Sequence, residues 1–175
     1  MTTTGQIIKN KSVVDDDWSL LRLAEGDAPE SVAVPAGKVL VPLTVWLAQR
    51  DALLHRADIG VWFASNERVE DLQDDAAKVS VIAVDFPKVG AGRGYTIATR
   101  LRTRFGYHGE LRAIGEVLRD QLFYMQRVGF DAFAVRADKD IHDALNGLSD
   151  FSISYQGSTD EAQPLFSRVE RGVAR

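Results

Sequence analysis

A glycine-rich turn with basic side chains is the stretch of this sequence best suited to chemistry. An apolar run at residues 79–84 leads through Asp85 and Lys88 into Gly90-Ala91-Gly92-Arg93-Gly94-Tyr95. Glycine lets backbone N–H groups approach a ligand, and a following helix adds partial positive charge at its N-terminus. With the charges of Lys88 and Arg93, the turn has the ingredients of a phosphate, sulfate or carboxylate site. The alternative is a loop whose glycines serve only tight turning.

The turn matches no nucleotide-binding motif. The dinucleotide pattern G-x-G-x-x-G would need glycine at Tyr95, and no Gly-Lys-Ser/Thr sequence of a P-loop occurs. The chain has no cysteine, which excludes thiolate-ligated iron–sulfur clusters, and its three histidines form no ligand set. We therefore expect no metal site, and the sequence leaves the cofactor unknown.

Short apolar segments alternate with helical patterns through the middle of the chain. The patterns predict strands at residues 39–45, 59–63, 79–84, 111–114, 132–135 and 151–155, with helices at 46–55, 69–78, 95–105, 116–128 and 139–145. Apolar strands joined by helices indicate parallel β-α units. We expect an α/β fold, a three-layer sandwich with a mostly parallel central sheet, and the alternative is a partial β/α barrel.

The two ends of the chain are expected to flank this core. Residues 1–38 read as an N-terminal peripheral segment with a short strand within 6–17, and residues 39–156 as the α/β core domain. Residues 157–175 are polar, lack a clear period and are predicted to form a C-terminal tail.

The charge of the chain is unevenly distributed. The formal net charge is −4 and the isoelectric point about 5.4, which argues against a nucleic-acid partner. Residues 85–131 nevertheless hold eight Lys/Arg against five Asp/Glu, a local charge of +3. A basic centre suits an anionic ligand, although an Arg-rich solvated helix face is the equal alternative.

Nothing in the sequence predicts contact with a membrane. The longest mostly apolar run, residues 39–48, is shorter than the roughly 20 residues that span a bilayer. The N-terminus lacks the apolar region of a signal peptide, so we expect a cytoplasmic protein.

Helical geometry indicates which of the basic side chains after the turn is best placed to contact a ligand. At about 100° per residue, Arg93, Arg100 and Arg104 fall on one side of the predicted helix. Arg93 is nearest the N-terminus and is the expected ligand contact, whereas the other two are expected to face solvent, a carboxylate or a partner.

Polar residues near the other strand ends are further candidates. Ser65 and Asn66 follow one strand and either lie at the functional edge or cap the next helix. Asp85 is a possible base or a residue that ties down a loop. Arg112 and Glu116 bracket another strand end. Gln121 falls within an apolar helix face, where a hydrogen bond to neighbouring backbone is the favoured role.

The residues that carry the turn also resemble a known family. Residues 86–95 read F-P-K-x-x-x-G-R-G-Y, and residues 109–133 read GELRAIGEVLRDQLFYMQRVGFDAF. Together with FSISYQ at 151–156, they resemble the bacterial domain of unknown function 934 over about residues 39–156. Members often carry Thr-Asp where this chain has Gly90-Ala91.

The resemblance implies a link to sulfite reduction. Family members are described as oxidoreductases of that process because their genes tend to lie beside the sulfite reductase haemoprotein gene. It implies candidate functional positions at Arg93, Tyr95, Arg112, Asp120 and Gln121, to which the turn adds Lys88, Gly92 and Gly94.

The turn and the resemblance together predict that the chain is an accessory protein of assimilatory sulfite reduction. It would bind a small oxyanion, or the reductase haemoprotein, through the Gly-Arg-Gly turn. A stand-alone flavin- or nicotinamide-dependent oxidoreductase and a non-catalytic dimeric adaptor, a homodimer that uses the Arg-rich helices as an interface, are the alternatives.

Overall fold

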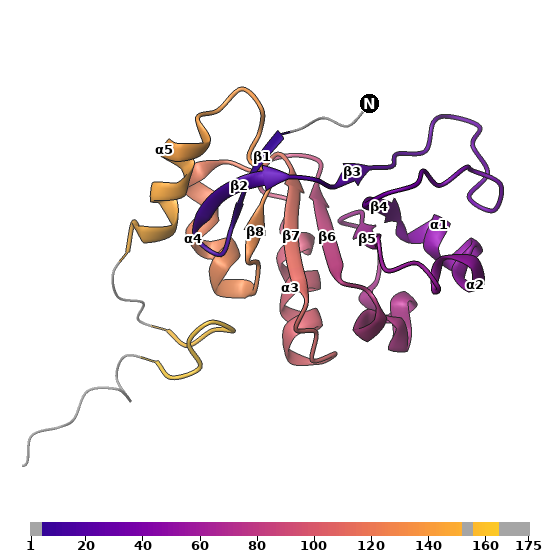
Figure 1. The fold of residues 1–175 in the computed structure, drawn as a ribbon. Helices are drawn as coiled ribbons and strands as arrows, with labels where there is room; N and C mark the ends of the chain where they lie inside the picture. Colours follow the sequence, from indigo (N-terminus) through magenta and orange to yellow (C-terminus); the bar gives the residue numbers. More distant parts are fainter. Residues whose placement is uncertain (1–4, 152–155, 165–175) are drawn as a thin grey trace, which may run out of the picture.

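The protein is built on one eight-stranded mixed sheet (Figure 1). The computed structural model describes residues 5–151 and 156–164. The strands are β1 (Gly5–Lys9), β2 (Ser12–Asp16), β3 (Ser19–Leu20), β4 (Val39–Pro42), β5 (Ile59–Phe63), β6 (Val81–Phe86), β7 (Glu110–Gly115) and β8 (Ala132–Phe133). Their order is β2-β1-β8-β7-β6-β5-β4-β3. Strands β3 to β8 are parallel, and the β1–β2 hairpin joins β8 in antiparallel orientation.

Helices connect the parallel strands and also follow the last of them, β8. They are α1 (Leu43–Ala48), α2 (Arg50–Leu53), the 3-10 helix η1 (Val69–Lys78), α3 (Arg93–Thr103), α4 (Arg119–Val128), α5 (Ile141–Asn146) and the 3-10 turn η2 (Gly147–Ser149). Within the described residues, none of these helices has the length and apolar character needed to cross a bilayer.

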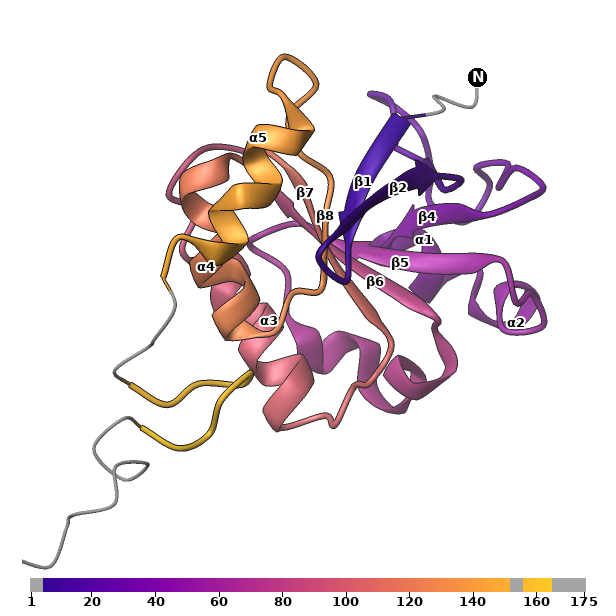
Figure 2. The same ribbon diagram turned by 60° about the vertical axis from the view of Figure 1, so that its left-hand side comes forward.

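Strand order decides between the two architectures that the sequence left open. From β4 to β8 each strand lies beside the next one in the chain, so right-handed crossovers place the connecting helices on one face of the sheet. The sheet curls into a half-barrel (Figure 2). The α/β class and the mostly parallel sheet are confirmed, and the architecture is the partial barrel rather than the three-layer sandwich.

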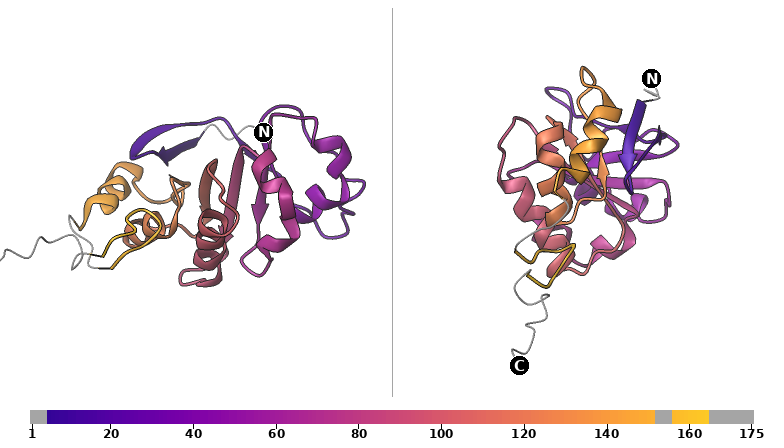
Figure 3. Two further views of the ribbon diagram at one scale, coloured as in Figure 1. Left: turned by 90° about the horizontal axis from the view of Figure 1, so that it is seen from below. Right: turned by 90° about the vertical axis from the view of Figure 1, so that its left-hand side faces the viewer.

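The two faces of the sheet pack against different parts of the chain. The outer face, with Val61, Val84 and Phe133, forms one large core with the buried residues of the helices. The inner face contributes a small cluster, Leu40, Trp62, Val81, Ala83 and Ile114, to which no helix contributes a buried residue. The β1–β2 hairpin lies on the side opposite α3 (Figure 3).

The N-terminal segment closes over the inner face. Asn10 and Lys11 turn the hairpin with φ of 49° and 62°, values that match a two-residue hairpin loop. Beyond β2, Trp18 packs against the inner cluster, and the carbonyl of Leu21 accepts a hydrogen bond from Trp62 Nε1 at 2.9 Å. Residues 16–22 therefore lead from β2, at one edge of the sheet, to β3, at the other edge, and contact the inner face on the way.

Several element boundaries differ from the sequence prediction. Strand β5 agrees, but β6 extends to Phe86, so Asp85 belongs to the strand. The helix predicted over 116–128 begins at Arg119, and the segment 69–78 is 3-10 rather than α-helical. Part of the strand predicted at 151–155 lies outside the described residues.

Candidate functional site

A cavity opens where the carboxyl ends of β5 and β6 lead into η1 and α3. It has a volume of about 270 Å³. Polar and basic side chains dominate its lining: Ser65, Asn66, Glu67, Arg68, Val69, Arg93, Thr96, Ile97 and Arg100. Ligands of parallel sheets gather at this edge, so the position agrees with the edge that the sequence analysis selected.

Arg93 is the basic residue of the cavity that has no partner within the part of the chain that the structure describes. Its side chain is exposed at the first position of α3, and its guanidinium makes no hydrogen bond or ion pair with any described residue. Arg68 and Arg100 also line the cavity, but both face Glu70, at 4.0 and 3.2 Å. Arg93 therefore has its hydrogen-bond donors available for a ligand.

Glu67 introduces a carboxyl group into the same cavity. Its Oε2 accepts a hydrogen bond from the backbone N–H of Ala64 at 2.6 Å, and its own N–H donates to the Ala64 carbonyl at 3.0 Å. Burial raises the pKa of Glu67, against the lowering effect of the Ala64 N–H, and the nearby Asp71 raises it further. The turn after β5 thus holds this carboxyl in a fixed position.

The glycines of the predicted turn have separate roles. Gly90 adopts a φ of +85°, which favours glycine. A Cβ at Gly94 would lie 2.6 Å from Phe86 Cε1, so this glycine lets the first turn of α3 pack against β6. A Cβ at Gly92 would meet nothing within 4 Å. Gly90 and Gly94 therefore serve the backbone conformation and the packing of the turn, and Arg93 is the residue of the turn that can bind a ligand.

Lys88 and Tyr95, which were also predicted as site residues, lie outside the cavity lining. Lys88 is exposed and makes no ion pair with a described residue. Tyr95 packs its ring against Phe86 and Tyr124, with centroids 5.3 and 5.0 Å apart, and burial raises the pKa of its hydroxyl. Tyr95 therefore joins α3 to α4.

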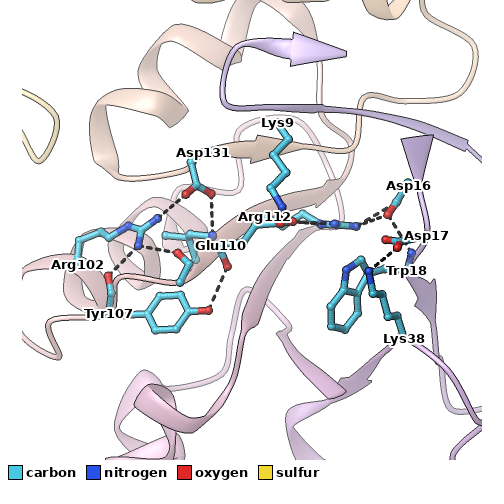
Figure 4. Close-up of polar contacts among 12 residues, drawn as sticks. Lys9, Asp16, Asp17, Trp18, Lys38, Arg102, Tyr107, Glu110, Arg112 and Asp131 are labelled. Atoms are coloured by element: carbon cyan, nitrogen blue, oxygen red, sulfur yellow. Dashed lines mark hydrogen bonds and ion pairs between the residues drawn. The ribbon is translucent and has the colours of Figure 1, made fainter. Parts of the chain in front are cut away.

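Arg112 lies on the inner face of the sheet, between Glu110 and Asp16 (Figure 4). Its side chain is only 4% exposed. Its guanidinium donates to Asp16 Oδ1 and Oδ2 at 2.8 and 3.0 Å and to Glu110 Oε1 at 2.8 Å. Lys9 reaches the second oxygen of Glu110 at 2.6 Å. The network ties the N-terminal hairpin to β7 and leaves Arg112 few donors for a ligand.

Asp120 and Gln121 lie at the start of α4. Asp120 lines a second cavity of about 340 Å³ with Arg119, Asp140 and Asp143. Gln121 Oε1 accepts the N–H of Leu118 at 3.2 Å, which is the hydrogen bond to neighbouring backbone that the sequence analysis favoured. Of the site residues predicted from the turn and the family resemblance, all of which are described, Arg93 alone lines the first cavity. Lys88, Gly92, Gly94 and Tyr95 are its neighbours in the turn, and Arg112 lies on the inner face of the sheet.

Asp85 has a partner from the N-terminal segment. Arg22 donates to both of its carboxylate oxygens at 3.2 Å and lies 5.0 Å above the Trp62 ring. This contact ties the segment down over the inner face. Among the described residues, no group of His, Asp and Glu has an arrangement that could hold a metal ion.

Sequence reasoning did not assign Glu67, Arg68 and Thr96 to the site. Glu67 and Arg68 follow directly after Ser65 and Asn66, so the rule that placed those two at the strand edge could have included them. Thr96 lies three residues after Arg93, one helical turn along α3, and helical spacing alone predicts their shared face.

Fold and site together define an α/β half-barrel with a basic cavity at the carboxyl ends of its strands. Residues 60–166 match the model of the family described as bacterial protein of unknown function (DUF934), and the chain belongs to this family. The search of curated proteins and the search of solved structures found no match.

Proposed function

We propose that this protein binds a small oxyanion in the cavity between the β5 loop and α3, as an accessory protein of assimilatory sulfite reduction. One observation carries the proposal: the exposed Arg93 has no hydrogen-bond or ion-pair partner among the described residues and lines a cavity together with Ser65, Asn66 and Thr96. A guanidinium with neighbouring hydroxyl and amide donors is a common way to bind an oxyanion.

The size of the cavity favours a small ligand. Sites for drug-sized molecules and cofactors usually measure about 300–1,000 Å³. A volume of about 270 Å³ suits sulfite, sulfate or phosphate better than a flavin or a dinucleotide. This is why we place the oxyanion ahead of a stand-alone flavin- or nicotinamide-dependent oxidoreductase.

The link to sulfite reduction comes from the family and not from the geometry. It rests on the description of family members as neighbours of the sulfite reductase haemoprotein gene. An accessory protein that binds both an oxyanion and the reductase could present the anion to the enzyme.

Titration calorimetry with sulfite, sulfate and phosphate tests the proposal. We expect saturable binding of at least one anion, weakened about tenfold or more by Arg93→Ala, since a charged hydrogen bond contributes about 1.5–3 kcal/mol. Arg104→Ala is the matched control because it removes the same charge at the residue that follows α3, and Arg104 does not line the cavity. Equal affinity in wild type and Arg93→Ala would contradict the proposal.

A second candidate function is docking of the reductase haemoprotein or of a second copy. Arg100 and Arg104 approach Glu70 Oε1 at 3.2 and 3.4 Å, so one carboxylate faces two exposed arginines, with Arg68 nearby. The excess of positive charge suits an acidic protein surface. Co-purification with the reductase, lost in Arg100→Glu/Arg104→Glu, would support docking, and light scattering of the isolated protein reports a homodimer.

A further inference from the structure

The cavity contains a feature that plain anion binding does not explain. A pocket for a fully ionised anion gains from donors and positive charge, and a carboxylate in its wall repels the ligand. Glu67 nevertheless lines the cavity together with Arg93. Its Oε2 is held by the Ala64 N–H at 2.6 Å, whereas its Oε1 has no hydrogen-bond partner among the described residues.

We infer that Glu67 selects oxyanions that carry a proton, such as hydrogen phosphate or hydrogen sulfite, over sulfate. A proton between Glu67 and the ligand turns repulsion into a hydrogen bond. Phosphate and sulfite exchange a proton near neutral pH, whereas sulfate remains fully ionised and would leave two acceptors facing each other. The inference rests on the proposed function, because it names the ligand class of the same cavity.

The surroundings of Glu67 support a shared proton. Burial raises the pKa of its carboxyl, which makes this group a better partner for a proton than an exposed glutamate. The charged groups around it are Arg68 on its own loop, Glu70 and Asp71 on η1, and Arg93 and Arg100 on α3. Among the described residues no histidine lines the cavity, so the carboxyl of Glu67, whose pKa is raised by burial, is the lining group whose protonation we expect to change as the pH falls.

The selectivity is expected to depend on pH in a defined direction. Above its pKa, Glu67 is ionised and disfavours sulfate, whereas its carboxylate accepts a hydrogen bond from the O–H group of hydrogen phosphate. Below its pKa, the protonated carboxyl donates to sulfate. The affinity for sulfate should therefore rise as the pH falls, and the preference for hydrogen phosphate should shrink.

Calorimetric titration with sodium phosphate and sodium sulfate tests the inference on the full chain. At neutral pH we expect phosphate to bind about tenfold or more tightly than sulfate. In Glu67→Gln the amide oxygen can still accept the Ala64 N–H, which keeps the turn, and the amide N–H₂ can donate to the ligand. This variant should bind sulfate more tightly than wild type and lose the pH dependence of sulfate affinity. Circular dichroism checks that it remains folded.

The possible failures are distinguishable. If both anions bind wild type equally and Arg93→Ala weakens both, the cavity binds oxyanions and the role of Glu67 is overturned. The same conclusion follows if Glu67→Gln keeps the wild-type preference. If neither anion binds wild type at any pH, the proposed function fails, and the inference fails with it.

Discussion

Arginines in two regions of this molecule show opposite relations to the rest of the chain. On the inner face, the buried Arg112 donates to Asp16 and Glu110. At the carboxyl edge, Arg93 is exposed and has no partner among the described residues. Both side chains carry the same charge, so net charge along the sequence cannot tell them apart. The arrangement of carboxylates decides which arginine stabilises the fold and which is available to a ligand.

Arg102 belongs with Arg112 in this comparison (Figure 4). Its guanidinium donates to the carbonyls of Gly129, Tyr107 and Gly109 at 2.9, 2.7 and 2.9 Å and to Asp131 at 3.2 Å. It therefore holds the end of α3 to the loops before β7 and β8. Although Arg102 and Arg93 lie on the same helix, only Arg93 reaches the cavity.

The largest effect is expected for Arg112→Ala. Removing this guanidinium leaves two carboxylates, Asp16 and Glu110, close together in a largely buried position. Breaking a buried ion pair costs about 3–5 kcal/mol, and Lys9 should hold the loss near the lower value. Urea unfolding measures this. Arg93→Ala is the control and should change the free energy of unfolding by less than about 0.5 kcal/mol. Equal losses in the two variants would break the comparison.

Alanine substitutions at the two glycines that flank Arg93 should differ in their effect on stability, because one glycine is packed against the core and the other is not. Gly94→Ala places a Cβ against the Phe86 ring and should destabilise the protein by about 1–3 kcal/mol, the usual cost of overpacking. Gly92→Ala enters open space at a helical φ of −60° and should be neutral or slightly stabilising. Thermal unfolding of both variants provides the test. If Gly92→Ala were the more damaging change, the packing role of Gly94 would be wrong.

Arg50, a third arginine with a partner in the fold, should make the free energy of unfolding depend on pH. Hydrogen bonds from Arg50 lower the pKa of Asp75 from 3.8 to about 2. Because the pKa is lower in the folded state, this stabilisation is present above about pH 4 and is lost as the pH falls toward about 2. Arg50→Ala should therefore destabilise most at neutral pH, with a difference from wild type that shrinks on acidification. Urea unfolding at several pH values measures it, and a constant difference would contradict this account.

A modest effect is expected for Gln121→Ala, which tests a residue that the family resemblance proposed as functional. Loss of its hydrogen bond to the Leu118 N–H should cost about 0.5–1.5 kcal/mol and leave anion affinity unchanged. Calorimetry with phosphate measures the role of Gln121 in anion binding, and urea unfolding measures its role in stability. A clear loss of anion affinity in a folded variant would restore Gln121 as a site residue.

Local patterns predicted much of the fold. The apolar run at residues 59–63 forms β5, and the alternation of strands and helices gave the parallel β-α units. The choice between sandwich and half-barrel depends on strand order, which is a long-range property that no local pattern contains. The helix predicted from residue 116 begins at Arg119 because Gln121 caps the backbone at Leu118.

The edge of the sheet at which the cavity lies could be predicted from the strand ends, whereas contacts between residues far apart in the sequence could not. The carboxyl edge and Arg93 followed from the turn after β6. The partners of Arg112 could not be foreseen, because Asp16 lies 96 residues away in the sequence. The position of Glu67 directly after Ser65 and Asn66 predicts that it lies near the same strand end, but no local pattern shows that its carboxyl lines a cavity.

The most direct test of the central claim follows arginine side-chain Nε–H signals by NMR during titration with phosphate. The account predicts a saturable shift of the Arg93 signal, with smaller shifts at Arg68 and Arg100, while the signals of Arg102 and Arg112 stay in place. A shift at Arg112 that equals or exceeds the shift at Arg93, or no shift at Arg93 at saturating phosphate, would contradict it.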